Sequence, residues 1–201
     1  MDYGGADFVW EALRLRRAGP STGHTGKMLT LEPMRATDLD LVTAWLDAPE
    51  VTRWYLVGST IAEEIDELHR CIVGVEPTTV LLVVERTKPI GWCQWYLCGD
   101  YPEHAREVGA DPDDAGIDYA IGDPTRRRQG VGTELIAALV THITQRHPRA
   151  GVIADPEASN TASRRVLEKN GFRLLDERPL ASEPTAAPMA IYRLAPDATA
   201  S

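Results

Sequence analysis

Long apolar segments and positive charge are both scarce in this 201-residue sequence. No apolar run approaches the ~18 residues that a membrane-spanning helix needs. Residues 1–27 are acidic at their start and lack the apolar stretch of a secretory signal peptide. The formal net charge is −9, so polyanions are repelled. We therefore expect a protein that binds neither membranes nor nucleic acid.

Cysteine is scarce as well, with Cys71, Cys93 and Cys98 as the whole set. An odd count at irregular spacing favours reduced thiols and a cytoplasmic protein. Cys93 and Cys98 fall at an odd separation on an expected strand, so they face opposite sides. His142 and His147 are five residues apart on an expected helix and do not share a face. The sequence therefore predicts no metal site.

Apolar periodicity and capping residues predict one mixed α+β domain without repeats. Residues 1–27 are interpreted as an extension or linker, residues 28–195 as the domain, and residues 196–201 as a tail that frays. Thr37 is expected to cap the first helix of the domain, and Thr60 with Glu63 forms a capping box for the second. The expected order is a strand at 28–35, helices at 38–47 and 61–74, a hairpin of strands at 78–85 and 90–98, a strand at 115–123, a helix from 131, a strand at 150–156, a helix at 159–172, and a closing antiparallel pair at 172–180 and 187–195.

Three arginines precede a glycine-containing turn in "RRRQGVG", which opens the helix at 131. Gly130 and Gly132 permit unusual backbone angles and close approach of another molecule. Successive N–H groups in such a turn, and at the start of a helix, attract anions. Arg127 and Arg128 add planar donors suited to phosphate, and Thr133 adds a hydroxyl. These features favour a diphosphate; the alternative is a tight strand-to-helix turn with solvated arginines.

Two motifs together resemble those of the GNAT N-acetyltransferases, namely "DPTRRRQGVGTELI" and, about 30 residues later, "ASNTASRRVLEKNGF". The resemblance implies a central, mostly antiparallel mixed sheet of about seven strands flanked by helices, in a single domain, and acetyl-CoA as cosubstrate. It implies that Ala120, Ile121 and Gly122 pair with the pantetheine arm and polarise the thioester carbonyl. The resemblance also implies that Asn160 contacts the pantetheine or fixes the neighbouring loop. The residues that would bind the pyrophosphate are Arg127, Arg128, Gln129, Gly130, Val131, Gly132 and Thr133.

Further stretches resemble the aminoglycoside 6′-N-acetyltransferases: "GIDYAIGD", "ADPEASN", "PIGWCQWY" and "VTRWYLVG". This resemblance implies that Asp118 accepts the proton of the acetylated amine or orients that amine. Asp155 would hold a second ammonium group, while Gln94 and Tyr96 contact sugar rings. Trp54 either stacks on a sugar or packs as a core or lid residue.

Residues 100–118 carry seven acidic side chains against a lone Arg106. Aminoglycosides bear several ammonium groups, so such a segment would steer and hold them. The alternative is an acidic loop that keeps the protein soluble. The acidic residues are Asp100, Glu103, Glu107, Asp111, Asp113, Asp114 and Asp118.

The sequence departs from the GNAT pattern at Leu167, where the family often has a tyrosine that protonates the departing thiolate. A thiol with a pKa near ~8.5 leaves tolerably well unaided. Water or another tyrosine such as Tyr119 would serve, although Tyr119 points away from Asp118 on a regular strand.

Other acceptors and roles remain open at this point. The Gly-Ile-Asp strand also resembles that of siderophore-pathway lysine N-acyltransferases. Acetylation of a protein N-terminus or a ribosomal protein would place a basic peptide in an acidic groove, and a non-catalytic acyl-CoA sensor is a further possibility. The expected assembly is a monomer or a homodimer.

Overall fold

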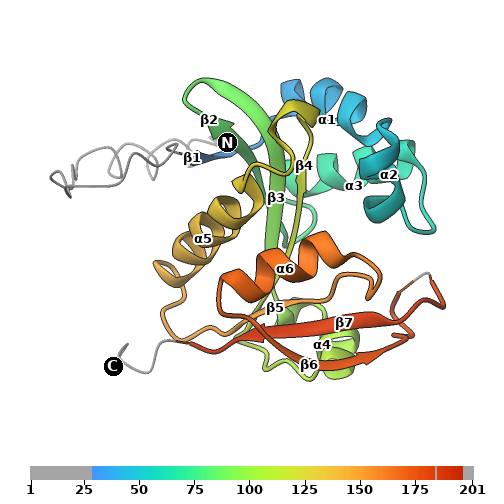
Figure 1. Cartoon of the computed structure of the whole chain (residues 1–201), viewed down its shortest axis with the longest axis vertical. Coiled ribbons are helices and arrows are strands. Elements are labelled where there is room, and N and C mark those ends of the chain that lie inside the picture. The colour runs from blue at the N-terminus through green and yellow to red at the C-terminus, as the bar shows by residue number, and fades with distance from the viewer. Residues whose placement is uncertain (1–28, 184, 197–201) are drawn as a thin grey trace, which may run out of the picture.

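The computed structural model describes residues 29–183 and 185–196. The predicted extension at 1–27 and nearly all of the predicted tail lie outside these residues. The described residues form a seven-stranded sheet in the order β1-β2-β3-β4-β5-β7-β6, flanked by helices (Figure 1). The strands are β1 (Leu29–Pro33), β2 (Thr79–Glu85), β3 (Lys88–Leu97), β4 (Ala115–Ile121), β5 (Val152–Ala154), β6 (Arg173–Arg178) and β7 (Met189–Leu194).

Every neighbouring pair of strands is antiparallel except β4 with β5. The predicted mixed, mostly antiparallel α+β class is therefore confirmed. The α-helices are α1 (Leu39–Leu46), α2 (Pro49–Tyr55), α3 (Ile61–Ile72), α4 (Pro102–Val108), α5 (Val131–Thr144) and α6 (Thr161–Lys169). None of these helices is long and apolar enough to cross a bilayer.

Strand β2 explains why both faces of the sheet are covered. Its residues alternate between two buried clusters, as the period of a strand requires. Leu81 and Val83 join the cluster under α5 and α6, whereas Val80, Leu82 and Val84 join the cluster under α1 and α3. Helix α4 packs on a third cluster that includes residues of β5 and β7. Figure 1 shows α1, α2 and α3 grouped apart from α5 and α6.

Local signals predicted some helix ends and missed others. The Thr60–Glu63 capping box is present, and Gly74 follows α3 with φ +77°, as expected. The prediction that Thr37 caps the first helix is wrong. Thr37 lies in a short 3-10 turn, Ala36–Asp38, whose Asp38 side chain accepts a hydrogen bond from the backbone N–H of Arg35.

The divergence of β4 from β5 positions the candidate site. Strand β4 pairs with β3 along its whole length, from Ala115 to Ile121. It pairs with β5 at only two residues, Ala115 with Val152 and Gly116 with Ile153. From Ile117 onward, β4 has no strand partner on this side. Its backbone there is available to another extended molecule.

Candidate active site

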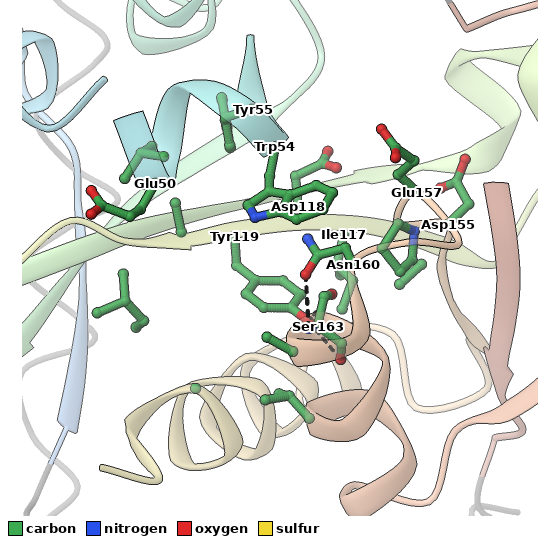
Figure 2. A pocket seen from close by; sticks show the side chains of 18 of the residues that line it. Glu50, Trp54, Tyr55, Ile117, Asp118, Tyr119, Asp155, Glu157, Asn160 and Ser163 are labelled. Carbon is green, nitrogen blue, oxygen red and sulfur yellow. Dashed lines mark hydrogen bonds between the residues drawn. The ribbon is translucent and has the colours of Figure 1, made fainter. Parts of the chain in front are cut away.

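A cavity of about 670 Å³ lies where β4 leaves β5. Figure 2 shows that its lining side chains come from β4, the start of α6, the end of α2 and the segment after β5. Of the residues proposed from the sequence, those that line it are Trp54, Gln94, Asp118, Ala120, Ile121, Arg127, Arg128, Gly130, Gly132, Thr133, Asp155 and Asn160.

The turn before α5 leaves the helix N-terminus open. Arg128 and Gly130 both have positive φ, +60° and +83°, so the backbone folds back tightly before the helix. Gly130 is the N-cap residue and has no side chain with which to cap the first N–H groups. Asp123 stabilises the approach to the turn by accepting hydrogen bonds from the Thr125 N–H and hydroxyl, at 2.8 and 2.7 Å. This geometry is suited to an anion.

The arginines of this turn divide their roles. The Arg127 guanidinium donates hydrogen bonds to the carbonyls of Ile121 (3.0 Å) and Gly122 (2.9 Å), so it fastens the turn to the end of β4. Arg128 is exposed and, within residues 29–183 and 185–196, forms no salt bridge. The same holds for Arg165 and Lys169 of α6, which also line the cavity. These three cations are free to meet phosphate oxygens.

The close packing of α6 on α5 explains the glycine at position 132. A Cβ atom at this position would lie 3.3 Å from a methyl group of Val166. The glycine therefore lets α6 approach the first turn of α5, and this approach brings Arg165 and Lys169 beside the open N-terminus.

Asp118 projects into the cavity from β4. Gln94 of β3 lies opposite it in the register and donates a hydrogen bond from Nε2 at 3.2 Å. Solvent reaches the carboxylate from within the cavity, but protein surrounds it. Burial, and then the negative charge of Asp155, raise the pKa of Asp118 to about 6. Such a group is largely ionised at neutral pH and titrates close to it, as a general base should.

Further carboxylates line the same space, and we call Glu64, Asp118, Asp155 and Glu183 the carboxylate cluster. Burial raises the pKa of Glu64 to about 7, with the charges of Glu67 and Asp118 adding to the effect. Burial and the charge of Asp155 also raise the pKa of Glu183. No lysine or arginine in the described chain forms a salt bridge with any of the four. Apart from His104, which contacts Asp155, the described residues provide no cationic partner for the cluster.

His104 of α4 is a basic side chain that contacts this cluster. Its Nε2 lies 3.5 Å from Asp155 Oδ2, and its Nδ1 lies 3.0 Å from the Ser182 hydroxyl. The hydrogen bond with Asp155 raises the pKa of His104. No local motif predicts this arrangement, because its partners come from three separate segments: α4, the residues after β5 and the residues before β7.

Aromatic packing holds α2 against the sheet and thereby positions Trp54 (Figure 2). The Trp92 indole donates a hydrogen bond to the Tyr55 hydroxyl at 2.9 Å, and it stacks with Trp45 at 6.0 Å. A Cβ atom on Gly122 would lie 2.1 Å from Trp45. Gly122 is therefore required by this packing and does not itself line the cavity.

Three more of the proposed residues lie away from the cavity lining. The Tyr96 ring occupies the space beside Gly116, where a Cβ atom would lie 2.2 Å from it, and packs on Tyr101. Val131 is the first residue of α5, and its side chain is buried in the core. The exposed Gln129 hydrogen-bonds to Arg126 and to the backbone of Thr125.

The prediction that residues 100–118 form the acidic acceptor wall needs correction. Asp118 is the one acidic residue of this segment that lines the cavity. Asp114 is buried and pairs with Arg193 at 2.7 Å, and Glu107 accepts hydrogen bonds from the N–H groups of Ala181 and Ser182. These acids hold the α4 region to β7 and the segment before it. The acidic lining comes instead from α3 and from the segments beside β5 and β7.

Leu167 is fully buried in the core, but Ser163 of the same helix forms a hydroxyl pair with Tyr119 of β4. Tyr119 Oη lies 2.6 Å from Ser163 Oγ, and both residues line the cavity. Asn160 caps α6 by accepting a hydrogen bond from the Ser163 N–H at 3.1 Å. Figure 2 shows Tyr119 pointing to the opposite side of β4 from Asp118.

Comparison with known families identifies the class of protein. Residues 35–180 match the model of the acetyltransferase (GNAT) domain. The chain belongs to this family and is a GNAT-domain N-acetyltransferase, as the two sequence motifs predicted.

The relatives are named for different acceptors, so they do not decide which amine this chain acylates. The chain is 26% identical over 152 residues to aminoglycoside N(6′)-acetyltransferase type 1 of Klebsiella pneumoniae, covering 74% of this chain and 76% of that protein. It is 34% identical over 172 residues to a lysine N-acyltransferase of Mycobacterium tuberculosis, covering 85% of this chain and 79% of that protein. A structure of AAC(6′)-Ib with paromomycin and acetyl-CoA superposes with a TM-score of 0.72 at 25% identity, over 83% of this chain and 93% of the other.

Proposed function

We propose that this protein transfers the acetyl group of acetyl-CoA to a primary amine of an aminoglycoside, at the 6′ position. The observation that carries the proposal is the opposite charge of the two ends of the cavity. Arg128, Arg165 and Lys169 surround an open helix N-terminus at one end. The carboxylate cluster, which lacks a lysine or arginine partner among the described residues, lies at the other.

The basic end supports acetyl-CoA as the donor. A diphosphate there would accept hydrogen bonds from the first N–H groups of α5 and would be neutralised by arginine and lysine side chains. The unpaired edge of β4, from Ile117 to Ile121, would hydrogen-bond an extended pantetheine arm. This arm would lead from Gly130 to Asp118, so the thioester would lie beside the carboxylate cluster.

The acidic end supports a polycationic acceptor. Four carboxylates with few counterions destabilise one another, and a ligand with several ammonium groups would relieve this repulsion. Trp54, which lines the same space, offers an aromatic face on which a sugar ring would pack. Asp118 and Asp155 would then hold different ammonium groups of one molecule.

The acceptor amine must lose a proton before or while it attacks the thioester, because an ammonium group has no free electron pair. Asp118 would accept that proton, directly or through water. The hydrogen bond from Gln94 holds the carboxylate in position and favours its ionised form. The result would be an acylated amine and a free thiol.

A second candidate is transfer to the side-chain amine of a lysine, favoured by the 34% identity with the lysine N-acyltransferase. A lysine carries a carboxylate beside its α-amine, and this group would need a cation near the acceptor end. His104, 3.5 Å from Asp155, is the candidate for that role. The carboxylate cluster gives the aminoglycoside the stronger support.

Thiol release from acetyl-CoA with a panel of acceptors tests the proposal. Tobramycin and kanamycin should be acetylated, analogues blocked at the 6′-amine should not, and free lysine should react poorly. Thermal unfolding should be shifted upward by acetyl-CoA and by tobramycin separately. Fast turnover of lysine without turnover of aminoglycosides would establish the second candidate.

The consequences of this activity for a cell are proposed on the same basis. Acetylation removes a positive charge from the antibiotic, so a susceptible bacterium that expresses the protein in its cytoplasm should become resistant. An unchanged minimum inhibitory concentration of kanamycin, with the active protein present, would contradict a role in resistance. The oligomeric state, monomer or homodimer, stays a prediction.

A further inference from the structure

Tyr119 and Ser163 form a hydroxyl pair at the wall of the cavity that faces α6. The two oxygens lie 2.6 Å apart, and Ser163 is held by the Asn160 side chain, which accepts its N–H. Figure 2 shows this chain of contacts from Asn160 through Ser163 to Tyr119. The pair therefore has a fixed place on the cavity wall.

Among the described residues, one of the two hydroxyl protons of this pair has no well-placed acceptor. Two hydroxyls carry two O–H protons, and their mutual hydrogen bond uses one of them. Within the described chain, the recorded acceptor for the other is the Ser163 carbonyl, at the long distance of 3.5 Å from Tyr119 Oη. A molecule in the cavity can therefore receive a hydrogen bond from this pair. Burial raises the pKa of Tyr119 to about 12, so the phenol keeps its proton at neutral pH.

The position of the pair relative to Asp118 gives it a chemical role. Asp118 and Tyr119 are consecutive on β4 and project to opposite faces of the sheet. In a tetrahedral adduct, the new bond to nitrogen and the breaking bond to sulfur leave the carbon in different directions. If Asp118 accepts the proton of the nitrogen on one face of β4, the opposite face is available to a group that protonates the sulfur. The thioester, held along the open edge of β4, would lie between the two residues.

We propose that the Tyr119 hydroxyl, positioned by Ser163, donates a proton to the sulfur of the departing thiol. This inference rests on the proposed function. In the step, the C–N bond forms and the C–S bond breaks. The amine proton passes to Asp118, and the sulfur takes its proton from Tyr119. Because the pKa of the phenol, about 12, lies above that of a thiol, ~8.5, Tyr119 gives up its proton only as water returns one to it through the Ser163 hydroxyl. Water then removes the proton from Asp118, so the sum is amine plus thioester giving amide plus thiol.

Ser163 lies four residues before Leu167 and so shares its face of α6. Leu167 is buried among core residues and carries no proton to give. The strand supplies through Tyr119 the hydroxyl that α6 lacks at position 167.

The test compares Tyr119→Phe with a matched control, Tyr101→Phe. Tyr101 also pairs with a hydroxyl, that of Thr78 at 2.7 Å, but it lies outside the cavity lining. With acetyl-CoA and tobramycin, we expect Tyr119→Phe to lower kcat roughly 100-fold. Its Kd for coenzyme A, measured by calorimetry, should stay within twofold of the wild type. Tyr101→Phe should retain full kcat. A kcat for Tyr119→Phe within threefold of the wild type overturns the inference.

Ser163 provides a second, independent arm. As a positioning residue, it should show a moderate loss of kcat in Ser163→Ala, about fivefold to tenfold, that Ser163→Thr restores, with coenzyme A affinity unchanged in both. If Tyr119→Phe does not fold, this arm decides, and full activity of Ser163→Ala overturns the inference. A wild-type protein that binds no acetyl-CoA and acetylates no amine refutes the proposed function instead, so the two failures are distinguishable.

Discussion

The carboxylate cluster should cost the free protein stability, and Glu64 lets this cost be measured. Its pKa rises from the ordinary 4.5 to about 7 in the folded chain. A carboxyl group whose folded pKa is raised binds its proton more tightly in the folded state. Its contribution to stability is therefore lost as pH rises from about 4.5 to about 7.

Replacement of Glu64 by glutamine removes this loss. At about 1.4 kcal/mol per pKa unit, the shift corresponds to a ceiling of roughly 3.5 kcal/mol above pH 7. Glu64 is partly exposed to the cavity, and solvent screening reduces this figure to about 1–2 kcal/mol. For a domain of this size, the melting temperature of Glu64→Gln should exceed that of the wild type by roughly 3–6 °C at pH 8.

The assay is denaturant unfolding at pH 4.5, 6 and 8, with Glu103→Gln as control. Glu103 is an exposed carboxylate of α4 outside the cavity lining, so its replacement should change stability little at any pH. The difference between Glu64→Gln and the wild type should be near zero at pH 4.5 and should grow with pH. Equal stability at pH 8, or a difference that does not depend on pH, would refute the view that burial and neighbouring carboxylates raise the pKa of Glu64.

Three more predictions test the two ends of the cavity. Asp118→Asn should lower kcat at least ~100-fold with cofactor affinity nearly unchanged. In the wild type, kcat/KM should fall about tenfold per pH unit below pH ~6, because protonated Asp118 cannot accept the amine proton. A near-normal rate of the variant, or a flat pH profile of the wild type, argues against this role of Asp118. Gly130→Val should abolish acetyl-CoA binding in calorimetry, because a β-branched residue is strained at φ +83°. The control Gly74→Val, at φ +77° beside α3, should cost stability only. If Gly130→Val retains its affinity for acetyl-CoA, the turn before α5 is purely structural. Arg128→Ala should weaken coenzyme A binding about tenfold at an unchanged melting temperature, whereas Arg127→Ala should lower the melting temperature, because it releases the end of β4; the reverse pattern would exchange their assigned roles.

Local signals explain how much of the fold the sequence predicted. The Thr60–Glu63 box lies within one helical turn, and the closing antiparallel pair joins two short strands that follow one another in the sequence, so neither depends on distant residues. Helices α2 and α4 were missed although their signals are present. Each begins with a proline, Pro49 or Pro102, and Gly109 follows α4 with φ +68°. The acidic composition of 100–118 suggested a loop and concealed this pattern.

The sequence predicted those parts of the candidate site that a single segment forms. It did not predict the parts that distant segments form together. The turn at 126–133 and the start of α6 at Asn160 carry their chemistry within a few residues. The neighbours of Asp118 do not, because Glu64 comes from α3 and Glu183 from the segment before β7. Tyr96 shows the converse case. Its alternation with Gln94 predicted a shared face, but the space beside Gly116 takes its ring away from the cavity.

The repulsion within the carboxylate cluster and the binding of a positively charged acceptor are thermodynamically linked. Natural proteins seldom leave buried carboxylates without partners unless a ligand compensates them. A single ammonium group would compensate Asp118 alone, whereas Asp155 and Glu183 would still repel each other beside His104. A polyamine that reaches from Asp118 to Asp155 would neutralise both parts of the cluster and lower the pKa values of Glu64 and Asp118 together. The stability lost in the free protein would then return as binding energy for acceptors with several ammonium groups, which is a physical basis for selecting them over simple amines.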